Sequence, residues 1–295
     1  MSVANINPNL FLGGVQKSGT TSLHYFLAKH PDIFFPPAPE ELHFFDVDRN
    51  YAKGLDWYLA HFTQCKTESI IAQTSPLYIY NPEVPPRIKE FNPEAKFIFI
   101  LRNPIDRAYS HYWNSVRYGY EHLSFEEAIA REPERIKQNS DYRRHYSYID
   151  RGKYTEQLQR YYQLFPQENI LVLLFDSLKK SYVDIGKICG EFLDVDPNLF
   201  VYSQTKQSVR NRAQIPRFDF LQQWISRQYD RQSKNEAMNI PFVVRAIEKI
   251  NLKNIKYAPM AETTKLKLIA EFKQEIISLQ KLLNIDLQDW LSLNK

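Results

Sequence analysis

One short polar segment of the chain combines residue types that could bind a phosphate. It holds a lysine, a glycine and four hydroxyl side chains: Lys17, Ser18, Gly19, Thr20, Thr21 and Ser22. An apolar run from Leu10 to Leu12 precedes the segment, and a helical pattern begins at Thr20. A strand, a loop and a helix in that order place backbone N–H groups, hydroxyls and one ammonium at a helix N-terminus. The segment is predicted to bind an anion, most simply phosphate. The plainer alternative is a glycine turn with a threonine cap.

The order of residues within this segment argues against an ordinary ATPase. Nucleoside-triphosphate loops of the form G-x-x-x-x-G-K-[ST] place the glycine directly before the lysine. In this chain Lys17 comes before Gly19. We therefore expect a loop that grips a phosphate and differs from that of common triphosphatases.

A second group of residues suggests another phosphate contact. Arg102 directly follows the apolar run 96–101, the clearest buried strand of the sequence. Pro104 suits the first turn of a helix, which places Ser110 about two turns further along. Arginine is the preferred fork for a phosphate dianion. Arg102 and Ser110 could share a phosphate, unless Arg102 only caps the end of the strand.

The elements that must position these residues alternate along the chain. Strands are expected at 10–12, 32–35, 69–74, 96–101 and 169–175, and the clearest helices at 152–165, from the last strand to about 192, and at 262–283. Apolar strands that alternate with helices are typical of a parallel sheet covered on both faces. Ligands bind at the carboxyl ends of such strands, so the two phosphate segments should gather there. The fold prediction is a three-layer α/β protein with a mainly parallel sheet, organised as a single domain, 1–295.

Composition narrows the classes of protein. The 295 residues are 43% hydrophobic with a net charge of +4, which is too mild to indicate a nucleic-acid partner. No stretch is long and apolar enough for a membrane span, and residues 1–8 show no secretory signal. Cys65 and Cys189 are the only cysteines, and the histidines show no metal spacing. We expect a cytoplasmic protein that needs no metal; its oligomeric state is left open.

Taken together, the two phosphate segments resemble the nucleotide-binding signatures of the PAPS-dependent sulfotransferases. The resemblance rests on Gly14-x-x-Lys17-Ser-Gly-Thr-Thr-Ser-Leu and on Arg102-Asn-Pro-x-Asp-Arg-Ala-x-Ser110, and it continues along most of the chain in the manner of bacterial members. It implies a fold like that of phosphate-loop proteins. It also implies that the segment from Lys17 to Ser22 holds the 5′-phosphosulfate of PAPS, and that Arg102 and Ser110 hold its 3′-phosphate.

A third segment, Glu41-Leu-His43-Phe-Phe-Asp46, resembles the Glu-Pro-His-Phe-Phe-Asp segment of the heparan sulfate glucosaminyl sulfotransferases. The resemblance implies that Glu41 is the catalytic base, with His43 and Asp46 beside it. An alcohol is a poor nucleophile, so a carboxylate within hydrogen-bond reach should take its proton during transfer. Two alternatives stay open. His43 and Asp46 could be a structural pair beside a solvated Glu41, or the adjacent Glu40 could be the base.

Basic residues crowd the segment between 201 and 234. They form either a solvated surface or a loop over the nucleotide. In the second case the resemblance places Lys206 and Arg210 near the 3′-phosphate, and the same charges could guide an anionic glycan.

The leading hypothesis is a PAPS-dependent sulfotransferase that transfers a sulfuryl group to a hydroxyl or amine and releases PAP. Lys17 would offset the charge on the departing phosphate oxygen. The acceptor is a small molecule or, favoured by the Glu41 segment, a glycan. A phosphate-loop kinase-like enzyme is one rival, although the sequence lacks its loop order and an evident magnesium carboxylate. A non-catalytic nucleotide- or glycan-binding protein is the other, because Gln73 and Thr74 replace an acidic residue and a lysine of the glucosaminyl enzymes.

Overall fold

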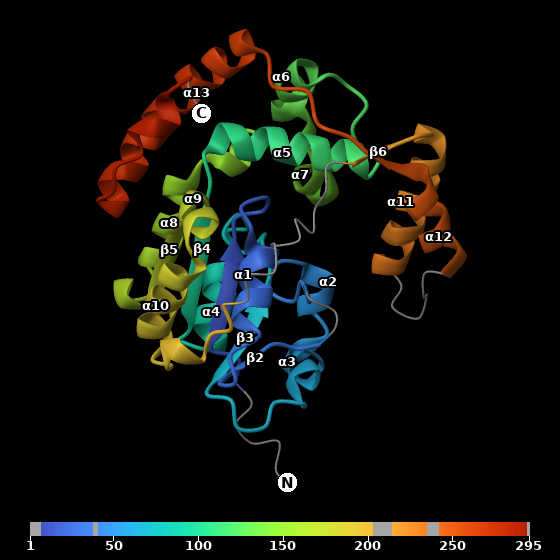
Figure 1. Ribbon diagram of the computed structural model, residues 1–295. Helices are drawn as coiled ribbons and strands as arrows, with labels where there is room; N and C mark the ends of the chain where they lie inside the picture. Colours follow the sequence, from blue (N-terminus) through green and yellow to red (C-terminus); the bar gives the residue numbers. More distant parts are fainter. Residues whose placement is uncertain (1–6, 38–40, 203–213, 235–241, 294–295) are drawn as a thin grey trace. The chain divides into compact units, whose positions relative to one another are not determined.

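The computed structural model describes residues 7–37, 41–202, 214–234 and 242–293 (Figure 1). The chain divides into two compact units. The first comprises the described residues of Met1–Asn103 and Tyr154–Gln207, and the second those of Pro104–Lys153 and Ser208–Lys295. The single domain expected for 1–295 stays a prediction. The Lys17 and Glu41 segments belong to the first unit, and Ser110 belongs to the second.

The first unit is built on a five-stranded parallel sheet in the order β2-β3-β1-β4-β5. Its strands are β1 (Leu10–Gly14), β2 (Ile33–Phe34), β3 (Ile70–Thr74), β4 (Lys96–Leu101) and β5 (Ile170–Leu174). Four strands lie within the predicted ranges, and β1 runs two residues further. The order places β1, which leads into the Lys17 segment, at the centre of the sheet between β3 and β4.

Both faces of this sheet are apolar, because alternate residues of the central strands pack in opposite directions. Leu12 of β1 joins one cluster with residues of α1 (Thr20–Leu27) and α10 (Tyr182–Leu193). On the other face the Phe97 ring lies 5.6 Å from Phe11 and 5.0 Å from Tyr161 of α8 (Tyr154–Tyr162). The prediction of an α/β fold with helices on both faces of a parallel sheet is confirmed.

The other helices of the first unit are short. They are α2 (Asp48–Tyr51), α3 (Gly54–Leu59), α4 (Val84–Phe91), α9 (Phe175–Lys180) and the 3-10 turns η1 (Ala60–Phe62), η3 (Gln167–Asn169) and η4 (Pro197–Leu199). The single helix predicted after β5 is wrong, since α9 and α10 are separate. Ser181 between them is extended, and its side chain accepts a hydrogen bond from the Asp184 N–H at 3.2 Å. This N-cap begins a new helix instead of continuing the old one.

The second unit is mainly helical. It contains α5 (Pro104–Arg117), α6 (Phe125–Arg135), α7 (Ser140–Tyr146), η2 (Asp150–Gly152), α11 (Asp219–Lys234), α12 (Phe242–Asn251), α13 (Glu262–Leu283) and η5 (Gln288–Leu291), with an antiparallel pair of β6 (Gln214–Pro216) and β7 (Leu252–Asn254). Helix α5 begins at Pro104 as predicted, and it contacts α6, α7 and α13. Among the described residues, no helix has both the length and the apolar character needed to cross a bilayer.

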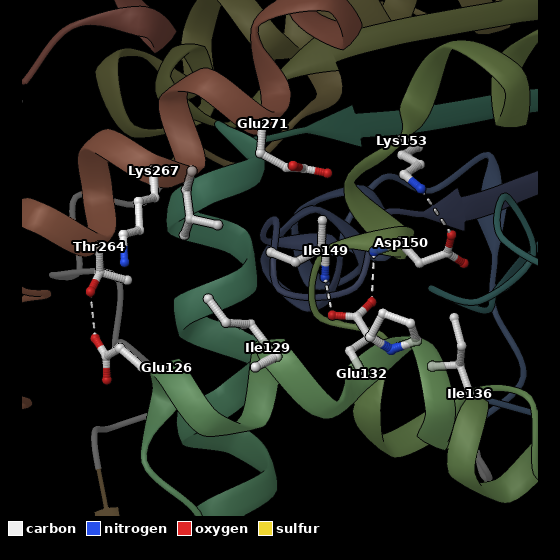
Figure 2. A pocket seen from close by; sticks show the side chains of 13 residues that line it. Glu126, Ile129, Glu132, Ile136, Ile149, Asp150, Lys153, Thr264, Lys267 and Glu271 are labelled. Atoms are coloured by element: carbon white, nitrogen blue, oxygen red, sulfur yellow. Dashed lines mark hydrogen bonds and ion pairs between the residues drawn. The ribbon is translucent and has the colours of Figure 1, made fainter.

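A buried carboxylate holds part of the second unit together. Glu132 of α6 lies in the wall of a cavity of about 560 Å³ (Figure 2). Its two oxygens accept the backbone N–H groups of Ile149 and Asp150, both at 2.7 Å, and so cap η2. Burial raises the pKa of Glu132 to about 7, although these bonds and the charge of Arg107 oppose the shift.

The raised pKa of Glu132 predicts a pH-dependent stability. The folded state favours the neutral acid, so this stabilisation is complete below pH 4.5 and is lost as the pH rises through about 7. Glu132→Gln cannot ionise, and the cost of placing its Nε2 against one backbone N–H is the same at every pH. We expect the free energy of unfolding of the variant, relative to wild type, to rise by about 2 to 3 kcal/mol between pH 5 and pH 8. Urea unfolding at both pH values measures this difference. The same difference in unfolding free energy between the two proteins at pH 5 and at pH 8 would contradict the raised pKa of Glu132.

Candidate active site

The segment after β1 forms the predicted turn into α1. Lys17 and Gly19 have positive φ angles of 73° and 91°, a region that glycine enters without steric cost. The Ser18 N–H donates to the Val15 carbonyl at 3.1 Å and closes the turn. Gly19 is the N-cap of α1 and has no side chain with which to cap it. The N–H groups of a first helical turn are suited to bind an anion.

Two buried hydroxyls lie at this edge of the sheet without a hydrogen-bond partner among the described residues. They are Ser18 Oγ in the turn and Ser75 Oγ just after β3, and both side chains are fully buried. The Ser75 N–H donates to the Leu12 carbonyl at 3.0 Å, which fixes Ser75 beside the end of β1. Buried polar atoms nearly always have a partner, so the pair fits a site for an oxygen-rich ligand. The sequence prediction did not include Ser75; the pairing of β1 with β3 is the signal that identifies it.

Arg102 contacts the Lys17 turn directly. Its Nη1 donates to the Lys17 carbonyl at 3.1 Å, and its guanidinium lies 4.9 Å from the centre of the Phe175 ring. The Arg102 carbonyl in turn accepts the Tyr154 hydroxyl at 2.9 Å. Arg102 therefore positions the turn, whatever else it binds. Ser110, its predicted partner, lies on α5 in the second unit.

Glu41, His43 and Asp46 form a continuous relay in the first unit. His43 Nδ1 lies 2.8 Å from Asp46 Oδ2, and His43 Nε2 lies 3.1 Å from Glu41 Oε2. The Asp46 side chain is 2% exposed, whereas the Glu41 side chain is 39% exposed. The relay thus runs from a buried anchor to a carboxylate that solvent or an acceptor can reach. This is the order that a positioned base requires.

The backbone around the relay is held by polar contacts. Asn50 donates from Nδ2 to the Leu42 and His43 carbonyls at 3.2 and 3.1 Å, and Asn81 Nδ2 donates to the Asp46 carbonyl at 3.0 Å. His43 itself has a positive φ of 49°, which is uncommon for a residue with a Cβ. These bonds hold the imidazole between the two carboxylates.

Gln73 and Thr74, which replace an acidic residue and a lysine of the glucosaminyl sulfotransferases, take part in buried hydrogen bonds. The Tyr58 hydroxyl donates to Gln73 Oε1 at 2.7 Å, and Gln73 Nε2 donates to the Tyr78 hydroxyl at 2.8 Å. Thr74 Oγ1 lies 2.8 Å from His24 Nδ1. Burial raises the pKa of Tyr58 and Tyr78 well above their usual value. The Gln73 amide links the two hydroxyls without placing a charge in this buried space.

The predicted site residues thus divide into three groups. The first unit holds the Lys17 to Ser22 turn, Arg102, Glu41 and His43. Ser110 lies in the second unit. Lys206 and Arg210 fall outside the described residues, so their role stays a prediction.

Comparison with known proteins identifies the family. Residues 7–236 match the model of the sulfotransferase domain. Over 200 residues the chain is 32% identical to heparan sulfate glucosamine 3-O-sulfotransferase 5 of Mus musculus, an alignment that covers 66% of this chain and 56% of that protein. It is 30% identical over 204 residues to bifunctional heparan sulfate N-deacetylase/N-sulfotransferase 2 of Bos taurus, covering 65% of this chain and 22% of that protein.

A solved structure has a similar fold over nearly the whole chain. The sulfotransferase from Alicyclobacillus acidocaldarius is 27% identical, with a TM-score of 0.69, and the match covers 98% of this chain and all of that one. The resemblance predicted from the Lys17, Arg102 and Glu41 motifs is confirmed, and the chain belongs to the sulfotransferase domain family.

Proposed function

We propose that this protein transfers a sulfuryl group from PAPS to a hydroxyl or amine of a glycan. The observation that carries the proposal is the Glu41–His43–Asp46 relay, which lies in the same compact unit as the Lys17 turn. One unit therefore offers both an anion site and a candidate base. The names of the two heparan sulfate sulfotransferases, one O- and one N-specific, support a glycan as the acceptor.

The Lys17 turn would hold the 5′-phosphosulfate of the donor. The uncapped N-terminus of α1 supplies N–H donors, and the lone hydroxyls of Ser18 and Ser75 supply two more. The Lys17 ammonium adds a positive charge where phosphate charge develops. Arg102 keeps the turn in place through the Lys17 carbonyl, and its predicted contact with the 3′-phosphate would come in addition.

The relay would remove the acceptor's proton. Each ring nitrogen of His43 faces one carboxylate, so the imidazole holds Glu41 by Oε2. Glu41 Oε1 can then take the proton of an acceptor hydroxyl. The acceptor oxygen forms a bond to sulfur while the bond from sulfur to the phosphate oxygen breaks, and PAP departs with that electron pair beside Lys17.

A screen of acceptors tests this proposal. The protein is incubated with sulfate-labelled PAPS in three separate reactions. One contains a glucosamine-containing polysaccharide, one its N-deacetylated form and one a small phenol. Mass spectrometry then identifies the product. We expect label in a glycan and one PAP released for each sulfate transferred. Label only in the phenol would overturn the glycan assignment, and no transfer to any acceptor would overturn the transferase assignment.

A further inference from the structure

Helices α11 and α12 of the second unit carry an unusually apolar surface. The five most exposed large apolar side chains among the described residues all belong to this region. They are Phe242 at 83%, Ile250 at 74%, Phe220 at 73%, Val243 at 62% and Phe218 at 57%, and Trp224 of α11 is 43% exposed. Exposed apolar residues scattered singly are normal, but a group of this size on two adjacent helices marks an interaction site.

Most of these side chains point to one side of the helix pair. Strands β6 and β7 pair antiparallel, with Pro216 opposite Leu252, so the helices that they flank also run antiparallel (Figure 1). The helices pack through Ile225 and Val244. Successive residues of a helix are rotated by about 100° around its axis. Trp224 and Phe220 are therefore rotated about 100–140° from Ile225. Val243 and Ile250 are rotated by similar angles from Val244, in the same direction around their own helix axis. In an antiparallel pair these displacements give a shared face.

The opposite side of α11 contacts the rest of the second unit. Ser226 is displaced from Ile225 in the other sense, and its hydroxyl donates to the Tyr118 carbonyl. Gln222 is fully buried on the same side, next to Gly119. The face with Phe220, Trp224 and Ile250 therefore points away from the body of its unit.

The charges around this face have one predominant sign. Six exposed side chains of this region are basic: Arg217, Arg227, Arg231, Arg245, Lys249 and Lys253. Arg227 and Arg231 are displaced about 160° and 120° from Ile225 in the sense of Phe220 and Trp224, whereas Arg245 and Lys249 are displaced from Val244 in the other sense. Asp219 is the exposed acidic side chain of the described residues 214–231 and 242–254. The two other carboxylates in these ranges accept tyrosine hydroxyls, Asp230 from Tyr120 at 2.9 Å and Glu248 from Tyr229 at 2.6 Å.

We infer that the α11–α12 face binds an anionic lipid bilayer surface. An interfacial helix combines large apolar side chains with Lys and Arg beside them, and each basic residue near an anionic leaflet strengthens binding. A second copy of the chain would fit poorly, because a symmetric contact brings Arg227 and Arg231 of both copies to the same interface. An anionic glycan would satisfy the cations but leave Phe220, Val243 and Ile250 in water.

Vesicle sedimentation with the full chain tests this surface. We expect binding to vesicles of phosphatidylglycerol and phosphatidylcholine, little binding to pure phosphatidylcholine, and loss of binding at high salt. Phe220→Ser with Ile250→Ser should weaken binding by about tenfold or more. Arg227→Gln with Arg231→Gln should weaken it by about fivefold for each charge removed. The matched control is Val183→Ser with Ile188→Ser on α10, where the exposed fractions are 45% and 41%.

Several results would overturn the inference. They are no binding to anionic vesicles, equal binding to neutral ones, or equal weakening by the control pair. A dimer in solution that the Phe220 and Ile250 substitutions dissociate would assign the face to a second copy instead. Unchanged thermal unfolding of each variant shows that the fold is retained.

Discussion

Glu41→Gln should lower the rate of sulfuryl transfer by about 10²–10⁴-fold while leaving PAP affinity unchanged. The amide keeps a similar shape and can still contact His43 Nε2, which lies 3.1 Å from the native carboxylate. It cannot accept the acceptor's proton. Only the step that needs a base is therefore affected. Initial rates at saturating donor, together with calorimetric titration of PAP, separate the two effects.

The control for this substitution is another exposed glutamate of the first unit. Glu83 is the N-cap of α4 and lies outside the relay, so Glu83→Gln should retain the wild-type rate. If Glu41→Gln also retained the full rate, the base assignment would fail, although the family assignment would stand.

Lys17→Ala is expected to reduce kcat/KM for the donor by about 10²–10³-fold. Lysine and alanine both carry a Cβ, so the cost of the positive φ at this position is nearly the same in both proteins. The turn also keeps its bond from Arg102, because that bond uses the Lys17 carbonyl and not the side chain. The loss should therefore report the missing ammonium.

Lys29→Ala provides the matched comparison, since Lys29 is an exposed lysine just beyond the end of α1. Stopped assays with labelled PAPS give both values of kcat/KM. Equal activity of Lys17→Ala and Lys29→Ala would show that the turn binds the donor without help from this charge.

Local sequence patterns predicted much of the first unit. The run Lys96–Leu101 was identifiable as a strand because it is apolar on both faces, and Pro104 marked the start of α5 because proline suits a first helical turn. The break at Ser181 was missed, since a serine cap inside an apolar stretch is a weak signal beside the helical period around it.

The site depended more on contacts between segments that are distant in the sequence. The resemblance of the Glu41–Asp46 segment to the glucosaminyl sulfotransferases placed His43 and Asp46 beside Glu41, but the bonds from Asn50 and Asn81 that support them are visible only in the fold. The place of Gln73 between Tyr58 and Tyr78 likewise depends on tertiary packing. Motifs predicted which residues form the site, and tertiary packing determined which neighbours support them.

The most direct test of the central claim compares two nucleotides by titration calorimetry. Wild-type protein and Lys17→Ala are each titrated with PAP and with ATP–Mg. The account predicts that wild type binds PAP at least about tenfold more tightly than ATP–Mg, a difference of about 1.4 kcal/mol, and that Lys17→Ala binds PAP more weakly than wild type does. Tighter binding of ATP–Mg to the wild-type protein would contradict the assignment of the Lys17 turn to a sulfuryl donor.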